Sequence, residues 1–218
     1  MKYLHTIFLT LGFILMGFAQ NGVYVNYSIS VEANGEQAEM MKSMMDGSTM
    51  ELAANAQRTW VKSTVGSMMT TEMGLNVESK EMTMYMSGMM GKMAFRGNPD
   101  VLEEVKPEEA EPNVELFDDT KTILGVLCKK ATIKDNDGNT TTFWYTEDFA
   151  RPEGMEQMPN SVPGLCLEFE ILTEGIKMVY TATVFDDKAD MADYTLSIPE
   201  DVEIQSFEDL INMGLNKN

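Results

Sequence analysis

Apolar and polar residues alternate along most of this chain with the period of two that is typical of half-buried β-strands. The alternation begins at residues 23–31 and recurs at intervals up to Pro199. Because successive side chains of a strand point to opposite faces, each segment has one apolar face and one polar face. The pattern predicts strands at residues 23–31, 49–54, 58–65, 67–77, 81–87, 92–95, 120–134, 140–146, 165–171, 178–184 and 194–198.

Two segments have helical spacing instead. In residues 36–45 the apolar side chains recur three to four positions apart, and Asp46-Gly47 follows as a stop signal. A closing helix is predicted to begin at Ser206, whose hydroxyl can cap the amides near Asp209. The acidic, proline-containing residues 97–113 indicate a loop with a short helix, and residues 135–139 indicate a hairpin turn.

The predicted elements define a mainly β (α+β) fold. Antiparallel strands joined by short turns, with no crossover helices between them, exclude a parallel α/β fold. About ten strands, an early helix and a short C-terminal helix fit a large curved antiparallel sheet or half-open β-barrel. We expect residues 21–218 to form a single domain, because that length is enough for one core.

The N-terminus has the features of a secretory signal peptide at residues 1–20. A weakly basic start is followed by a short apolar run at residues 7–18, and small residues precede a cleavage site after Ala19 or Gln20. This predicts a soluble, exported protein, periplasmic or extracellular, with no integral membrane span after cleavage. The formal net charge of −19 argues against nucleic acid as a partner.

Methionine and histidine are unusually distributed. Fourteen of the 21 methionines fall between Met40 and Met93, and the one histidine, His5, lies in the leader. Without histidine, the exported chain lacks the commonest general base, and its two cysteines cannot complete a zinc site of the usual kind. We therefore expect a protein that is not an enzyme, with no cofactor and no catalytic residues.

Two segments resemble a known group of proteins. Residues 124–131 (Leu-Gly-Val-Leu-Cys-Lys-Lys-Ala) and 143–146 (Phe-Trp-Tyr-Thr) resemble a paired run in the uncharacterised secreted proteins of the GLPGLI and DUF4412 group. Residues 162–169 (Val-Pro-Gly-Leu-Cys-Leu-Glu-Phe) resemble the signature that names the first group, with Val162 and Cys166 as departures. The resemblance implies the fold of periplasmic lipoprotein carriers (LolA/LolB-like), a half-open barrel with an apolar cavity for acyl chains.

The methionines permit two functional hypotheses. In the first, they line a concavity that binds a lipid or another apolar small molecule, because flexible thioethers adapt to varied shapes. The predicted lining is Met41, Met44, Met45, Met69, Met73, Met82, Met84 and Met86. In the second, Met82, Met84 and Met86 bind Cu(I) in an envelope-stress protein, but neighbours about 6.6 Å apart along a strand need help from another element. Plain core packing explains the same pattern, and a structural role in an envelope complex with an unknown protein partner is a third alternative.

A disulfide between Cys128 and Cys166 is possible in an oxidising compartment. The strand layout argues against it. If residues 140–147 lie between the two cysteine-bearing strands, the cysteines are about 9.6 Å apart, which is beyond disulfide reach. Free thiols are therefore the preferred prediction.

Overall fold

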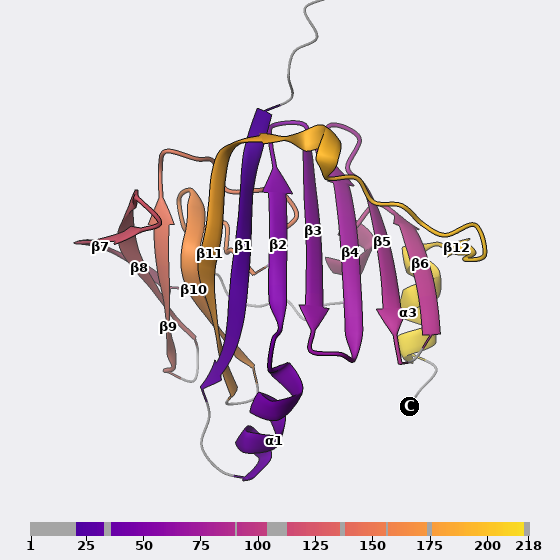
Figure 1. Ribbon diagram of the computed structural model, residues 1–218, viewed down its shortest axis with the longest axis horizontal. Helices are drawn as coiled ribbons and strands as arrows, with labels where there is room; N and C mark the ends of the chain where they lie inside the picture. The colour runs from indigo at the N-terminus through magenta and orange to yellow at the C-terminus, as the bar shows by residue number, and fades with distance from the viewer. Residues whose placement is uncertain are drawn as a thin grey trace, which may run out of the picture.

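The computed structural model describes residues 21–32, 36–89, 91–103, 113–135, 138–155, 157–173 and 176–215; the predicted signal peptide lies outside them. These residues form one sheet with the strand order β12-β6-β5-β4-β3-β2-β1-β11-β10-β9-β8-β7 (Figure 1). The paired strands are antiparallel, apart from β12, which is parallel to β6. The strands are β1 (Asn21–Glu32), β2 (Thr49–Ala54), β3 (Arg58–Val65), β4 (Met69–Asn76), β5 (Glu81–Gly88), β6 (Gly91–Gly97), β7 (Asn113–Ile123), β8 (Val126–Lys134), β9 (Thr140–Thr146), β10 (Leu165–Thr173), β11 (Ile176–Asp190) and β12 (Ile204–Gln205).

The mainly β architecture predicted from the sequence is confirmed, with twelve strands where about ten were expected. The helical elements of the described residues are α1 (Glu36–Met45), α2 (Asp100–Glu103), the 3₁₀ turn η1 (Met191–Asp193) and α3 (Phe207–Leu215). The bounds of α1 are those predicted. The short α2 lies in the acidic loop 97–113, of which residues 104–112 are outside the described part. No described helix has the length and apolar character to cross a bilayer.

A capping box begins α3, as the sequence predicted. The Asp209 backbone N–H donates to Ser206 Oγ at 3.2 Å, and the Ser206 N–H donates to the Asp209 carboxylate at 3.0 Å. This reciprocal pair satisfies amides that have no partner inside the helix. The Ser206 hydroxyl also donates to the Asp209 carboxylate at 2.8 Å, and this bond, together with the one from the Ser206 N–H, lowers the pKa of Asp209.

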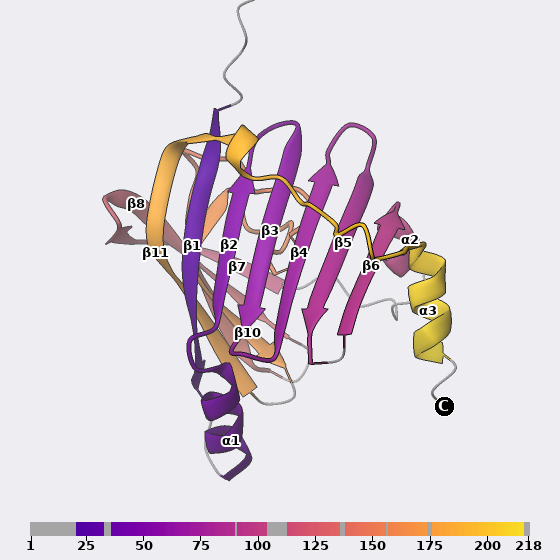
Figure 2. The same ribbon diagram turned by 45° about the vertical axis from the view of Figure 1, so that its right-hand side comes forward.

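The sheet curls, so that its β7–β10 end turns behind β1–β4 (Figure 2). Alternation assigns apolar side chains to the concave face, where Val25 and Tyr27 of β1 pair with Leu52 and Met50 of β2. All four side chains are buried or nearly so. The largest core cluster extends from these strands to β8, β9, β10 and β11. The curl therefore brings the two ends of the sheet around one core.

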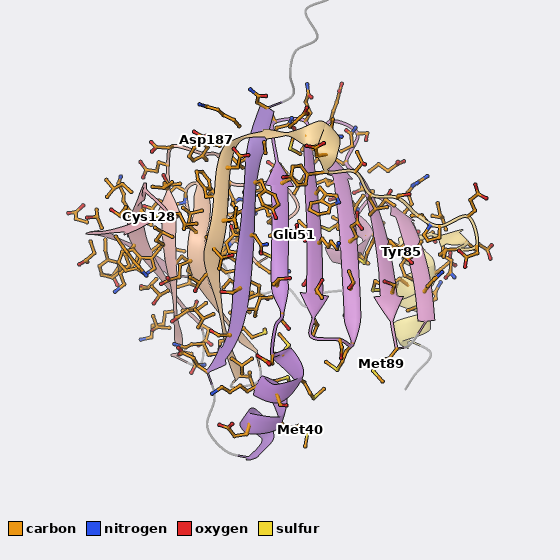
Figure 3. The ribbon with its side chains drawn as sticks, in the orientation of Figure 1. Met40, Glu51, Tyr85, Met89, Cys128 and Asp187 are labelled. Atoms are coloured by element: carbon orange, nitrogen blue, oxygen red, sulfur yellow. The ribbon has the colours of Figure 1, made fainter. Side chains whose placement is uncertain are left out.

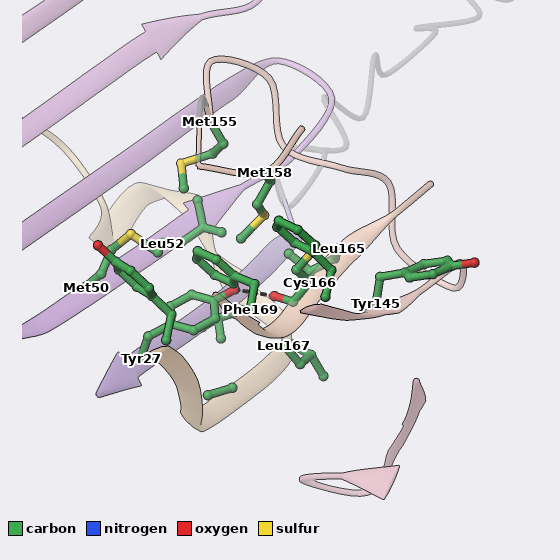
Figure 4. Packing of buried hydrophobic residues seen from close by; sticks show 14 of the residues in the cluster. Tyr27, Met50, Leu52, Tyr145, Met155, Met158, Leu165, Cys166, Leu167 and Phe169 are labelled. Carbon is green, nitrogen blue, oxygen red and sulfur yellow. Dashed lines mark hydrogen bonds between the residues drawn. The ribbon is translucent and has the colours of Figure 1, made fainter. Parts of the chain in front are cut away.

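The loop at residues 147–164 fills part of the concave side. Met155, Met158 and Val162 of this loop are 1–2% exposed and belong to the largest core cluster. Figure 4 shows Met155 and Met158 above Phe169 and Leu165. At Gly154, an added Cβ would lie 2.7 Å from Leu75 Cδ2, so the loop reaches across to β4. A connection between adjacent strands thus acts as a core element.

On the convex side, residues 191–203 cross the sheet from β11 to β12, in front of the strands in Figure 1. Tyr194 stacks on Tyr24 with ring centroids 5.0 Å apart, and lies 5.4 Å from the Trp60 ring. Leu196 packs against this cluster, and Arg58 donates to the Met191 carbonyl. The sequence predicted a strand at residues 194–198, which is wrong. The aromatic contacts hold this segment across the strands, so it cannot pair beside one.

The predicted single strand at residues 120–134 is also wrong. Residues 120–123 are the end of β7, which begins at Asn113, and residues 126–134 form β8; the two strands are antiparallel, with Ile123 opposite Val126. Between them, Leu124 and Gly125 have φ values of 49° and 85°. Two central residues with positive φ make the tight turn that matches the twist of a hairpin. The hairpin of β8 and β9, predicted at residues 135–139, is confirmed by the pairing of Lys134 with Thr140.

Candidate functional site

The eight methionines predicted to line a ligand cavity do not converge on one cavity. Met45 and Met82 are buried in the core, and Met44 and Met69 are exposed. The other four are partly exposed and pack against the core: Met41, Met73, Met84 and Met86. Of these eight, Met82 alone contributes to the pockets described below. Met40 and Met89, outside the predicted set, are 66% and 83% exposed near the α1 end of the sheet (Figure 3).

A row of stacked aromatic rings lies on the concave face of β9, β10 and β11. Phe169 of β10 is paired in register with Phe143 on one side and Tyr180 on the other. The Phe169 and Tyr180 rings are 4.6 Å apart at 8°, and the Phe169 and Phe143 rings are 6.3 Å apart at 1°. Strand register thus places three rings, far apart in sequence, nearly parallel to one another. We call Phe143, Phe169 and Tyr180 the aromatic row.

A pocket of about 490 Å³ opens over this aromatic row. Its volume is within the range of roughly 300–1,000 Å³ typical of small-molecule sites. Its apolar lining comes from four strands and the loop 147–164 and comprises Ile133, Phe143, Pro159, Ile171, Leu172, Met178 and Tyr180. Burial raises the pKa of Tyr180, so its phenol stays neutral and the floor of the pocket carries no charge.

The rim of this pocket is polar. Asp135, Asn139, Thr141 and Glu170 contribute to it. The Glu170 carboxylate pairs with Lys177 Nζ at 3.2 Å and accepts the Thr142 N–H at 2.8 Å. Asp135 accepts hydrogen bonds from the backbone and side chain of Asn139 at 2.8 Å. These bonds fix the positions of both carboxylates. The pocket therefore has apolar walls and an acidic, hydrogen-bonding rim.

A second pocket, of about 550 Å³, lies between the loop 147–164 and strands β4 and β5. Its lining mixes apolar side chains of the sheet and loop with the charged residues Lys80, Asp100, Arg151 and Glu153. Arg151 donates to the Met158 carbonyl at 3.2 Å, which ties the charged wall to the buried part of the loop. Opposite charges line the same space, so this pocket has no single electrostatic preference.

The two glutamates that alternate with buried residues on β10 each pair with a lysine. Glu168 pairs with Lys121 Nζ at 2.7 Å, and Lys121 also lies 5.5 Å from the Trp144 ring centroid. Glu170 pairs with Lys177, as described above. Each carboxylate thus has a cation of its own. This arrangement is that of ion pairs that stabilise the sheet surface, not that of an acid group facing a base group.

Cys128 and Cys166 are free, buried thiols. They lie on β8 and β10 with β9 between them, which is the layout that argued against a disulfide. Desolvation raises the pKa of Cys166 to about 12 and that of Cys128 to about 11. Tyr27 closes the region around Cys166 by donating its hydroxyl proton to the Cys166 carbonyl at 2.7 Å (Figure 4).

We expect both thiols to resist labelling in the folded protein. With a pKa near 12, the thiolate fraction at pH 8 falls on the order of 10³-fold below that of an ordinary cysteine. Since both folded pKa values are raised, the stability contributed by the neutral thiols is fully present below about pH 8.5 and is lost as the pH rises toward the folded values. The measurement is iodoacetamide labelling at pH 8, followed by mass spectrometry, with and without urea. Rapid labelling of the folded protein would contradict the burial, and two unlabelled cysteines in urea would reveal a disulfide.

No group of three or more His, Cys, Asp or Glu side chains in the described part of the chain is arranged to hold a metal ion. Thioether sulfurs are a separate case, considered below.

The fold and the site define a β protein with one large, curled, mainly antiparallel sheet. A loop fills part of the concave side of this sheet, and an apolar pocket opens beside it. The chain matches the family described as "N-glycanase peptide, N-terminal domain" over residues 34–169, and it belongs to that family. One similar solved structure is titled "Structure of PNGF-II in C2 space group". It has a TM-score of 0.47 and 18% identity, with 88% of this chain and 32% of that chain covered. This chain thus spans about a third of that structure's length. No curated protein matches it.

Proposed function

We propose that this chain is a non-enzymatic, exported binding protein that holds a lipid or another apolar ligand over the aromatic row. The observation that carries the proposal is the pocket of about 490 Å³ whose floor includes Phe143 and Tyr180. Aromatic and aliphatic walls with a few polar groups at the mouth are the usual make-up of small-molecule sites. The resemblance to lipoprotein carriers supports the same ligand class.

The acidic rim restricts the class of ligand that the pocket can bind. Asp135 and Glu170 lie at the mouth, and the chain as a whole has a net charge of −19. A ligand with an anionic head group would meet repulsion there, whereas a neutral head group can accept or donate hydrogen bonds at the rim. We therefore expect a neutral amphiphile, such as a monoacylglycerol, to bind more tightly than the fatty-acid anion of equal chain length.

A charge placed in the pocket should weaken this binding. Met178→Glu puts a carboxylate among apolar walls and should weaken binding of a neutral fluorescent acyl probe by at least about tenfold, because burying an unpaired charge is costly. Val184→Glu is the matched control: it lies on the same strand, is 48% exposed and is outside the pocket lining. The measurement is a fluorescence titration of each variant, with folding checked by circular dichroism. Equal affinities in both variants would contradict the site, and no uptake by the wild type would contradict the function.

The family match favours a second candidate function, as a substrate-recognition module of N-glycanase type that binds N-glycoproteins. The matched family is described as an N-terminal domain, which implies a role beside a catalytic part. Calorimetric titration with a denatured N-glycoprotein, before and after removal of its glycans, tests this candidate. Binding that depends on the glycans would support it, and the absence of binding to either form would remove it.

A further inference from the structure

The strand register assembles methionines that the sequence could not bring together. Met84 of β5 lies directly opposite Met73 of β4, and Met86 of β5 lies directly opposite Met93 of β6. Met84 and Met86 are two residues apart and therefore share a face of the sheet. We call Met73, Met84, Met86 and Met93 the thioether quartet.

Two pairs within the quartet lie directly opposite each other, whereas Met73 and Met93 lie on strands that β5 separates. Directly opposed residues of antiparallel strands have Cβ atoms about 4.5–5.5 Å apart, less than the ~6.6 Å between alternate residues along one strand. The methionine sulfur lies two bonds beyond Cβ on a chain of rotatable single bonds, so neighbouring sulfurs can turn toward a common point. Strands β4 and β6 thus supply the additional thioethers that a metal site on β5 alone would lack.

The surroundings of the quartet are apolar but open to solvent. All four side chains are partly exposed and pack against the cluster of Phe95, Phe207 and Met82. Partial exposure leaves a path for an ion, and the apolar neighbours favour soft sulfur donors over hydrated hard cations. Met82, which the sequence grouped with Met84 and Met86, is only 5% exposed and belongs to the buried base of this cluster.

We propose that the thioether quartet provides a binding site for a soft monovalent metal ion, Cu(I) or Ag(I), which Met84 and Met86 bind together with Met73 or Met93. Thioether ligands select such ions over the divalent metals that prefer imidazole or carboxylate. Binding is coordination alone and changes no oxidation state. The quartet lies on β4, β5 and β6, whereas the apolar pocket lies on β8 to β11, so this site is independent of the proposed ligand function.

Silver(I) nitrate in chloride-free buffer is the probe, because Ag(I) has the ligand preference of Cu(I) without its redox chemistry. Calorimetry should show one tightly bound Ag(I) per chain. In a protein labelled with ¹³C at the methionine methyl groups, the quartet signals should shift first. The fourfold variant Met73→Leu, Met84→Leu, Met86→Leu and Met93→Leu should lose at least about 100-fold in affinity.

The matched control removes four thioethers elsewhere: Met40→Leu, Met44→Leu, Met69→Leu and Met89→Leu, which are 66%, 42%, 36% and 83% exposed in the folded protein. It should bind Ag(I) as the wild type does. If the fourfold quartet variant does not fold, Met84→Leu alone serves, and it should weaken binding and remove the shift of Met73. No tight Ag(I) binding by the wild type, or equal losses in the two fourfold variants, would overturn the proposal.

Discussion

Phe169→Ala is expected to lower the free energy of unfolding by about 3–5 kcal/mol, the range for truncating a buried phenylalanine. Phe169 is fully buried and is the middle ring of the aromatic row. Its ring also meets Tyr27 edge to face, with centroids 5.6 Å apart. Alanine would leave a cavity beneath the pocket and remove contacts to β1, β9 and β11 at once.

Urea unfolding followed by circular dichroism measures this effect, since the free energy of unfolding falls linearly with urea concentration and can be extrapolated to water. Phe117→Ala is the control. Phe117 is partly exposed on β7, and its recorded ring contact is with Lys130 Nζ, 5.2 Å from the ring centroid. An exposed cation–π pair contributes about 0.5–1 kcal/mol, so the control should lose much less. Similar losses in the two variants would mean that the aromatic row is not the centre of the core.

Gly164→Ala is expected to cost at least about 3 kcal/mol, the upper end for a strained backbone conformation, because steric overlap adds to the strain. Gly164 has φ +101°, where residues with a side chain are rare, and an added Cβ would lie 2.1 Å from the Thr146 carbonyl oxygen. Gly164 immediately precedes β10, whose Leu165 pairs with Thr146 at the end of β9. The close approach therefore closes the loop that carries Met155 and Met158 into the core.

Gly125→Ala separates the cost of the backbone conformation from the cost of the steric overlap. Gly125 has a similar φ of +85°, but nothing lies within 4 Å of an added Cβ. Alanine there should cost only the backbone term, about 1–2 kcal/mol. Thermal or urea unfolding of both variants measures the difference. If Gly125→Ala proves as destabilising as Gly164→Ala, the contact with Thr146 contributes nothing to the effect.

Much of the sheet could be predicted from the alternation of side chains, because each strand buries one face. Strands β1 to β6 follow it closely, and helix α1 follows the helical spacing of residues 36–45. The alternation failed where a tertiary contact or an atypical turn decided the outcome. Leu124 is an unusual residue for a tight turn and adopts φ 49° because Gly125 and the pairing of β7 with β8 require it. Residues 194–198 alternate like a strand, but Tyr194 packs on Tyr24 and Trp60 instead.

Less of the thioether quartet and of the aromatic row could be predicted from the sequence. Alternation correctly placed Met82, Met84 and Met86 on one face of β5, but only the register reveals that Met73 and Met93 lie opposite them. The aromatic row had a visible signal, because Phe143, Phe169 and Tyr180 each occupy an inward position of a predicted strand. What the sequence lacked was the register of the strands, which makes these three rings neighbours.

The loop 147–164 also takes up part of the concave side of the sheet. Met155, Met158 and Val162 of this loop are buried against the sheet. These side chains occupy concave space that an open half-barrel would leave to a ligand. The remaining apolar space lies at the side, over β8 to β11, where the pocket of about 490 Å³ opens.

Photo-crosslinking tests the central claim most directly, because it shows where an apolar ligand lies. The probe is a neutral monoacylglycerol with a photoreactive group in its acyl chain, added to the folded protein and mapped by peptide mass spectrometry. We predict that the label falls on Phe143, Ile171, Met178 and Tyr180, and that excess unlabelled monoacylglycerol displaces it. Label confined to Met40 and Met89 or spread over the surface, without displacement, would contradict the assignment of the pocket as a binding site.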